Sequence, residues 1–171
     1  PLLYKENGFK KQESAENLIA ELSGKTAVVE SIERGTSRKK APLLFNLAEL
    51  QAECSKRFKI SPDETLRIVQ ELYEKKMTTY PRTDARVLST AVTKEIHKNI
   101  GGLRSYALAT PFAKEVLEHG TYKNIAKTRY VNDKQITDHY AIIPTGQGLN
   151  ALSSVAPTAH RVYDLIVRRF L

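Results

Sequence analysis

The chain has 171 residues, 41% of them hydrophobic and 27% charged, which suits a folded globular domain and excludes disordered, collagen-like and disulfide-stapled proteins. Lysine and arginine number 27 against 19 aspartates and glutamates, and the net charge of +8 favours a polyanionic partner. No apolar run approaches the roughly 18 residues that cross a bilayer, so we expect no membrane partner. The one cysteine, Cys54, excludes an internal disulfide and fits a reducing cytoplasm.

The N-terminal part predicts a helix followed by a strand. Apolar residues spaced by three and four over residues 13–22 indicate a short helix, and Gly24 ends it. Residues 26–32, Thr-Ala-Val-Val-Glu-Ser-Ile, are rich in β-branched side chains and predict a strand.

A basic stretch separates this part from the rest of the chain. Residues 34–40, Arg-Gly-Thr-Ser-Arg-Lys-Lys, are either a solvated loop or a contact to a DNA backbone through Arg38 and Lys39. We place a domain boundary here, between residues 1–40 and residues 41–171.

Residues 41–171 predict five helices. Asn46, with glutamate three residues later, and Ser61, followed by proline and two acids, are typical N-caps of the first two helices. Their short connection suggests a helix-turn-helix-like pair, and Cys54 falls on the apolar stripe of the first helix. The others are predicted from 90 to 100, ended by Gly101-Gly102, from 110 to the glycine at 120, and from about 157 onward. The expected fold class is mainly α with a minor β part.

The segment between the second and third of these helices carries the chemistry. Residues 77–89 read Met-Thr-Thr-Tyr-Pro-Arg-Thr-Asp-Ala-Arg-Val-Leu-Ser, and Pro81 biases Tyr80 toward an extended backbone, where alternate side chains share one side. Tyr80, Arg82 and Asp84 would then project together. A phenolate can attack a phosphodiester, and a guanidinium can bind its oxygens and offset charge in the transition state. The alternative is a polar surface turn in which Arg82 and Asp84 merely pair.

Four segments of the chain resemble one enzyme family. Residues 79–84, Thr-Tyr-Pro-Arg-Thr-Asp, resemble the active-site signature of type IA DNA topoisomerases, and proline after the tyrosine resembles the topoisomerase III branch. Residues 42–51 resemble the family's lead into a helix, and residues 65–74 resemble the helix before its tyrosine. Residues 138–145, Asp-His-Tyr-Ala-Ile-Ile-Pro-Thr, resemble its histidine segment, in the family's order and approximate spacing.

The resemblance implies a mechanism and the residues that perform it. In this family a tyrosine cleaves single-stranded DNA and forms a transient 5′-phosphotyrosine, a second strand passes, and religation reverses the attack without a nucleotide energy source. Tyr80 matches the nucleophile, Arg82 the arginine at the scissile phosphate, and His139 the histidine near the site. Asp84 matches the signature's aspartate and is expected to support them.

Residues near these positions are expected to assist. Asp138 would favour the charged form of His139 if the two side chains touch, because a histidine can carry a proton near neutral pH. Tyr140 stands where topoisomerase III relatives often have a second histidine. The expected DNA contacts are Arg82, Thr83 and Arg86, with Arg38 and Lys39.

The resemblance also implies parts that this sequence lacks. Type IA enzymes bind magnesium beside the tyrosine through the acidic cluster of a Toprim domain, whereas these 171 residues contain no Asp-x-Asp motif. We therefore expect Mg²⁺ to be bound outside the chain and none within it. The chain opens at Pro1, and we interpret it as an excised piece of a parent protein, inactive by itself. Residues 1–40 would be a partial β-rich arch segment, and residues 41–171 the helical domain with the active-site tyrosine.

The expected partners are single-stranded DNA and the Toprim and remaining domains of the same parent chain, in the cytoplasm at a bacterial-type nucleoid. Two other classes stay open. One is a non-catalytic helix-turn-helix DNA-binding module, in which Tyr80 would contact a phosphate or a base. The other is a protein-interaction domain with a basic surface. Only the topoisomerase hypothesis predicts a covalent bond between DNA and a tyrosine.

Overall fold

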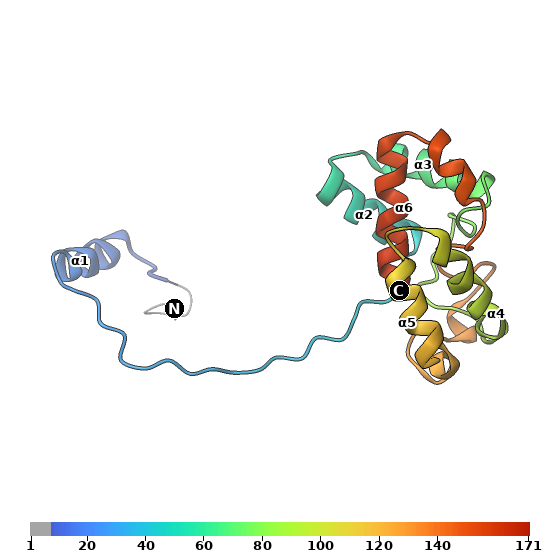
Figure 1. Cartoon of the computed structure of the whole chain (residues 1–171). Helices are drawn as coiled ribbons and strands as arrows, with labels where there is room; N and C mark the ends of the chain where they lie inside the picture. Colours follow the sequence, from blue (N-terminus) through green and yellow to red (C-terminus); the bar gives the residue numbers. More distant parts are fainter. Residues whose placement is uncertain (1–7) are drawn as a thin grey trace. The chain divides into compact units, whose positions relative to one another are not determined.

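The computed structural model describes residues 8–171, and the chain divides into two units, Pro1–Lys39 and Lys40–Leu171. The first unit contains α1 (Gln12–Leu22), close to the helix predicted from the apolar spacing (Figure 1). The helix predicted over residues 13–22 is therefore confirmed. None of the described residues of this unit, 8–39, is buried.

The strand predicted for residues 26–32 is not formed, and this prediction was wrong. Val28, Val29 and Ile32 are 79%, 75% and 76% exposed, and no backbone hydrogen bond joins this run to another part of the described range 8–39. β-branched residues favour an extended backbone, but a strand is stable only when a neighbouring strand accepts its hydrogen bonds. The described residues of this unit accordingly show no β-rich arch segment.

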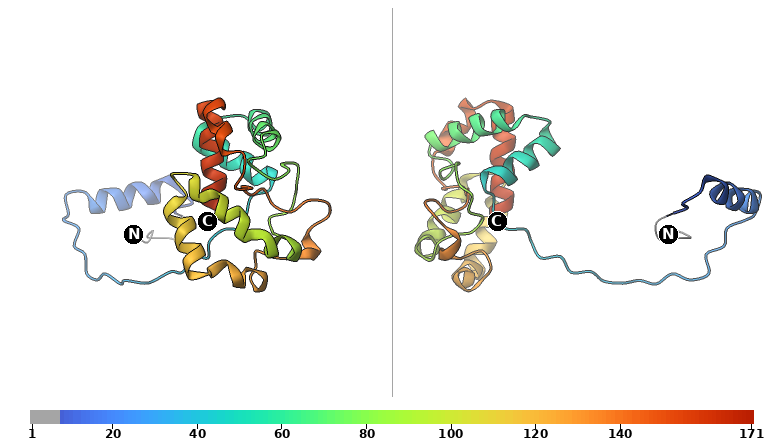
Figure 2. Two further views of the ribbon diagram at one scale, coloured as in Figure 1. Left: turned by 45° about the vertical axis from the view of Figure 1, so that its right-hand side comes forward. Right: turned by 180° about the vertical axis from the view of Figure 1, so that it is seen from behind.

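The second unit is mainly helical, as expected. Figures 1 and 2 show α2, α3 and α6 gathered at one end and α4 and α5 at the other. The helices are α2 (Leu47–Phe58), α3 (Pro62–Glu74), α4 (Thr90–Gly102), α5 (Thr110–His119) and α6 (Pro157–Phe170). Short 3₁₀ turns are η1 (Leu103–Ser105), η2 (Thr121–Lys127), η3 (Asp133–Gln135) and η4 (Leu149–Ser154).

The predicted N-caps of α2 and α3 are confirmed. Asn46 Oδ1 accepts a hydrogen bond from the Glu49 backbone N–H at 2.9 Å, and Ser61 Oγ accepts one from the Glu64 N–H at 3.1 Å. Such caps satisfy N–H groups that have no partner within a helix. Helices α2 and α3 pack on each other, and α3 also packs on α6. This packing fits a helix-turn-helix-like pair, but the motif itself stays a prediction.

The core of the second unit lies between these helices. α3 contributes Val69 and Leu72, and α6 contributes Tyr163 and Ile166, each at most 1% exposed. Cys54 on α2 is fully buried, as its place on the apolar stripe predicts, and burial raises the pKa of its thiol to about 11. A buried thiol with a raised pKa is unreactive, so Cys54 serves to pack the core.

Three isolated β-bridges are the β structure among the described residues. Phe45 pairs with Ile142 and Thr78 with Pro144, both antiparallel, and Leu88 pairs with Val131 in parallel. The first two bridges bind the segment around residues 139–145 to the connections before α2 and after α3. They thereby place the expected histidine segment beside the expected tyrosine segment.

Helix α4 ends at the predicted pair of glycines, with Gly102 as its last residue. Gly102 also allows a close approach, because a Cβ there would lie 2.1 Å from the Gly146 carbonyl oxygen. Asn99 Nδ2 also donates to the Pro144 carbonyl at 3.0 Å, so the end of α4 holds the loop that follows the histidine segment.

Candidate active site

The tyrosine segment is extended, and its side chains alternate between the core and solvent. Thr83 and Ala85 are only 7% and 6% exposed, whereas Arg82 and Asp84 are exposed and Tyr80 is half-buried. This alternation is the one that the extended segment after Tyr80 predicts. The phenol, the guanidinium and the carboxylate therefore belong to the side that does not face the core.

Two threonine hydroxyls join the tyrosine segment to the histidine segment. Thr79 Oγ1 donates to the Ala141 carbonyl at 3.0 Å and accepts from the Ile143 N–H at 2.9 Å. Thr83 Oγ1 donates to the His139 carbonyl at 2.7 Å and accepts from the Ala85 N–H at 3.1 Å. Each hydroxyl thus joins the tyrosine segment to the backbone of the histidine segment, and Thr83 holds the backbone of His139 itself.

Tyr80 and His139 lie against each other. Their ring centroids are 4.4 Å apart with 42° between the ring planes. Tyr73, near the end of α3, stands edgewise to Tyr80, with centroids 5.4 Å apart and an interplanar angle of 80°. Such pairs restrict ring orientation, so the phenol of Tyr80 is held by one neighbour from α3 and another from the histidine segment.

Sequence reasoning missed Tyr73 and Thr79 as site residues, and it expected Thr83 to contact DNA rather than to hold the backbone of His139. Tyr73 sits on a helix and contacts Tyr80 only because the chain turns back at the end of α3. A spacing of seven residues would place both tyrosines on one face of a continuous helix, but α3 ends at Glu74, between them.

Arg82 and Asp84 do not form the ion pair that the polar-turn alternative requires. Among the described residues, neither side chain has a hydrogen-bond or ion-pair partner. Asp84 is held through its backbone, because its carbonyl accepts from Asn46 Nδ2 at 3.1 Å. The exposed guanidinium of Arg82 is therefore available to a phosphate.

The remaining expected site residues are paired with other groups, are exposed, or belong to the first unit. Arg86 Nε donates to the Leu44 carbonyl at 3.3 Å, and its Nη2 lies 3.3 Å from Glu49 Oε1, so this side chain ties the tyrosine segment to α2. Asp138 is exposed and forms no ion pair with His139 in the described part of the chain. Contact of Thr83 and Arg86 with DNA stays a prediction. So does DNA contact by Arg38 and Lys39, which are exposed in the first unit.

A cavity of about 550 Å³ opens beside Tyr80. Tyr140 is half-buried in its wall, and burial raises the pKa of its phenol. The lining residues combine aromatic rings with groups that form hydrogen bonds or carry charge. They are Tyr73, Glu74, Lys76, Thr78, Thr79, Tyr80, His139, Tyr140, Thr145 and Gln147.

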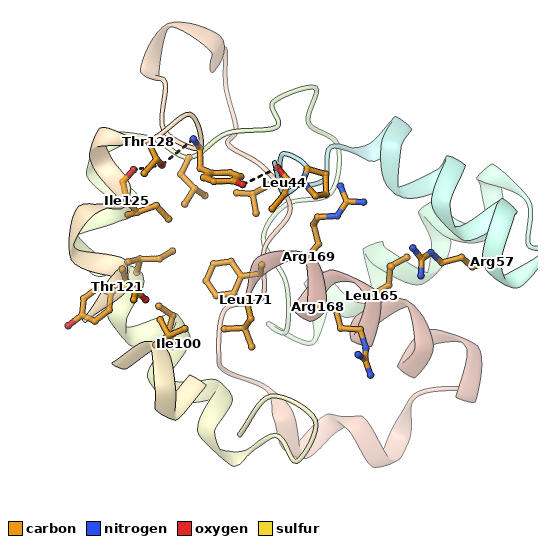
Figure 3. Close-up of a pocket in the computed structure, with 18 residues that line it drawn as sticks. Leu44, Arg57, Ile100, Thr121, Ile125, Thr128, Leu165, Arg168, Arg169 and Leu171 are labelled. Carbon is orange, nitrogen blue, oxygen red and sulfur yellow. Dashed lines mark hydrogen bonds between the residues drawn. The ribbon is translucent and has the colours of Figure 1, made fainter. Parts of the chain in front are cut away.

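A second cavity, of about 530 Å³, is mostly apolar and contains none of the expected site residues. Figure 3 shows Ile100 and Ile125 on one side of it and Leu171 on the other. The Tyr130 hydroxyl donates to the Ala41 carbonyl at 3.0 Å in its wall. The chemistry expected of the chain belongs to the first cavity, because that cavity contains Tyr80 and His139.

Within residues 8–171, no three side chains of His, Cys, Asp or Glu converge in a way that could hold a metal ion. The residues present therefore do not fit a magnesium site, which needs several convergent oxygen ligands. No helix in the described part of the chain has both the length and the apolar character needed to traverse a bilayer.

An exposed arginine two residues from a tyrosine that packs on a histidine is an arrangement suited to phosphodiester chemistry. The chain belongs to the DNA topoisomerase family, whose model matches residues 3–171.

Among its relatives is DNA topoisomerase 3 of Bacillus subtilis, 38% identical over 161 residues that make up 94% of this chain and 22% of that protein. DNA topoisomerase 3 of Bacillus licheniformis is 39% identical over 155 residues, 90% of this chain and 21% of the relative. The enzyme of the same name from Shouchella clausii is 38% identical over 161 residues, 92% and 21% of the two chains. The resemblance to the topoisomerase III branch is confirmed, and the chain spans about a fifth of the length of these relatives.

Proposed function

We propose that this chain is the tyrosine-bearing part of a type IA DNA topoisomerase, which cleaves and rejoins single-stranded DNA and so relaxes or decatenates DNA without ATP. The observation that carries the proposal is the packing of the Tyr80 ring on the His139 ring, with the ring centroids 4.4 Å apart. Arg82, whose guanidinium is unpaired in the described structure, follows Tyr80 by two residues. The family membership and the names of the relatives support it.

In the proposed reaction, Tyr80 Oη attacks the phosphorus of the scissile phosphodiester. The new bond is a phosphotyrosine at the 5′ end, the bond to the 3′ oxygen breaks, and this oxygen takes up a proton while the phenol loses its own. Arg82 binds the phosphate oxygens and offsets the charge that develops on them. His139, beside the phenol, contacts the same phosphate or carries a proton between the reacting oxygens. Religation is the reverse attack by the 3′ hydroxyl.

The remaining parts of the reaction are proposed to lie outside residues 1–171. We place the magnesium ion and its acidic ligands in a Toprim domain of the same protein, with the chain here supplying the nucleophile. The partners are then single-stranded DNA and the other domains of that protein, in the bacterial cytoplasm at the nucleoid. Residues 1–171 alone are expected to bind DNA without cleaving it.

The proposal is tested by exchanging two neighbouring tyrosines for phenylalanine in the complete topoisomerase. Tyr80→Phe removes the nucleophilic oxygen but keeps the ring that packs on His139, so strand cleavage should disappear while DNA binding stays within about twofold. Tyr73→Phe is the matched control, because it removes a hydroxyl from the ring beside Tyr80 and should leave cleavage intact. Cleavage by the Tyr80→Phe protein at the unmodified rate would refute the assigned nucleophile and favour a non-catalytic DNA-binding module.

A further inference from the structure

The cavity beside Tyr80 contains groups that the proposed cleavage step does not use. Its volume of about 550 Å³ lies within the range of roughly 300–1,000 Å³ that small-ligand sites occupy. Tyr80 and His139 form one part of the cavity wall. Lys76, Thr78 and Tyr73, near the end of α3, form another.

Lys76 has an unusual backbone conformation for its residue type. Its φ is +60°, in the left-handed region, which glycine enters freely and L side chains enter only at a cost in free energy. The backbone is held there, because the N–H donates to the Tyr73 carbonyl at 2.8 Å and the carbonyl accepts from the Thr145 hydroxyl. These two hydrogen bonds fix the backbone from which the Lys76 side chain reaches the wall of the cavity.

The ammonium group of Lys76 is exposed and has no partner among the described residues. Two other cations of α3 and its C-cap are engaged: Arg67 Nη2 lies 2.6 Å from Glu64 Oε1, and Lys75 Nζ lies 3.9 Å from Glu71 Oε1. Lys76 therefore supplies an unpaired positive charge at the cavity that contains Tyr80.

Thr78 gives an independent indication that the cavity takes a polar ligand. The side chain is 1% exposed, and its hydroxyl is buried with no hydrogen-bond partner in the described structure. Leaving a buried hydroxyl without a partner is unfavourable, so a polar atom in the cavity would stabilise this wall. Tyr73, 39% exposed, presents part of an aromatic ring to the same space.

From these groups we infer that the cavity is a subsite for one nucleotide of the single strand, next to the phosphate that Tyr80 attacks. Lys76 contacts a backbone phosphate, Tyr73 packs on the base, and the Thr78 hydroxyl hydrogen-bonds a polar atom of the nucleotide. Proteins that bind single strands combine cations along the backbone with aromatic rings under the bases in this way. The inference rests on the proposed function for the identity of the strand, but it concerns binding rather than cleavage.

The chain offers a matched pair of variants to test the phosphate contact. Lys59 also has a left-handed backbone, with φ of +59°, and is exposed at the end of α2, but it does not line the cavity. Lys76→Gly and Lys59→Gly each remove one positive charge and relieve the same backbone conformation. The melting temperature of residues 1–171 should therefore stay the same or rise in both variants.

Binding of a fluorescent oligothymidylate by the 171-residue chain, measured by anisotropy over a range of salt concentrations, distinguishes the two lysines. Lys76→Gly should weaken binding and reduce the slope of log affinity against log salt by about 0.7, the contribution of one phosphate on a single strand. Lys59→Gly should leave both quantities unchanged. Equal effects of the two variants, or no binding by the unmodified chain, would overturn the subsite.

The base contact is tested with an oligonucleotide of the same length whose nucleotides are abasic. The unmodified chain should prefer the oligothymidylate, and Tyr73→Leu should reduce that preference about fivefold or more, the value of one stacked base. An unchanged preference would overturn the role of Tyr73. These readouts do not depend on cleavage, so absence of a covalent adduct on Tyr80 would defeat the proposed reaction while leaving the subsite standing.

Discussion

Arg82 lies two residues after the tyrosine, and its exposed positive charge has no partner in the described structure. In the complete topoisomerase, Arg82→Ala should slow strand cleavage by roughly 10²- to 10³-fold, the usual loss for one donor that stabilises transition-state charge. Arg82→Lys should restore only part of the rate, because an ammonium cannot reproduce the two parallel hydrogen bonds of a guanidinium. Single-turnover cleavage of a labelled single strand measures both. Full activity of the lysine variant would contradict a bidentate contact.

Thr83 acts on His139 through the backbone rather than through a proton. Thr83→Val keeps the shape of the side chain but leaves the His139 carbonyl and the Ala85 N–H without their hydroxyl partner. The free energy of unfolding should fall by about 1–3 kcal/mol, the cost of leaving such groups unsatisfied. Thr93→Val is the control, because the Thr93 hydroxyl bonds only to the Thr90 carbonyl of its own helix and its loss should change stability little. Chemical denaturation of residues 1–171 measures the free energy of unfolding of both variants. Equal losses would show that the Thr83 hydroxyl contributes no more to stability than a hydroxyl on an exposed helix.

At the scale of single elements, the end of α4 holds the loop that lines one side of the cavity. Gly101 and Gly102 are adjacent in this helix, yet a Cβ at Gly101 meets nothing within 4 Å, whereas one at Gly102 would meet the Gly146 carbonyl oxygen at 2.1 Å. Gly101→Ala should raise the free energy of unfolding by about 0.5–1 kcal/mol, because alanine is the better helix former.

Gly102→Ala should lower the same free energy by about 1–3 kcal/mol, as expected when an added methyl group must displace backbone. Thermal or denaturant unfolding of the two variants side by side is the measurement. If both alanines stabilise the protein, the loop around Gly146 can move away from α4 at little cost in free energy. The end of α4 would then not be what positions Thr145 and Gln147 at the cavity.

The elements that local signals define were predictable from the sequence. Asn46 and Ser61 cap their helices as expected, because a cap is a contact between residues three apart. The conformation of residues 26–32 was not predictable from local signals, because a strand forms only beside a partner strand. No such partner occurs in the described residues of that unit. The end of α4 at Gly101-Gly102 was predictable, but the close approach of Gly102 to the Gly146 carbonyl was not, because it is a contact between distant segments.

The candidate site shows the same division. Tyr80, Arg82 and His139 could be named from their local motifs, and the alternation of exposed residues after Tyr80 followed from the proline next to it. The contact of Tyr73 with Tyr80, and the threonine hydroxyls that hold the histidine segment, join residues that only the folded chain brings together. Family resemblance supplied roles for the first set, but it did not indicate these contacts between distant segments.

At the scale of the whole molecule, the net charge of +8 predicts DNA binding that salt suppresses, without catalysis by this chain alone. The 171-residue chain should bind a labelled single strand weakly, and each phosphate that it neutralises should add ~0.7 to the salt slope. Supercoiled plasmid incubated with it should stay supercoiled with or without magnesium, since no set of oxygen ligands for Mg²⁺ converges within residues 8–171. Magnesium-dependent relaxation by this chain would place the whole active site inside it.

Trapping the covalent intermediate in the complete topoisomerase shows whether Tyr80 becomes joined to DNA. The enzyme is incubated with a labelled single strand, denatured rapidly, digested with protease, and the modified peptide is located by mass spectrometry. We expect a phosphodiester between the 5′ end of the cleaved strand and Tyr80 Oη, found in the peptide that contains residues 79–84. An adduct on Tyr73, Tyr140 or any other residue, or cleavage with no tyrosine adduct, would contradict it.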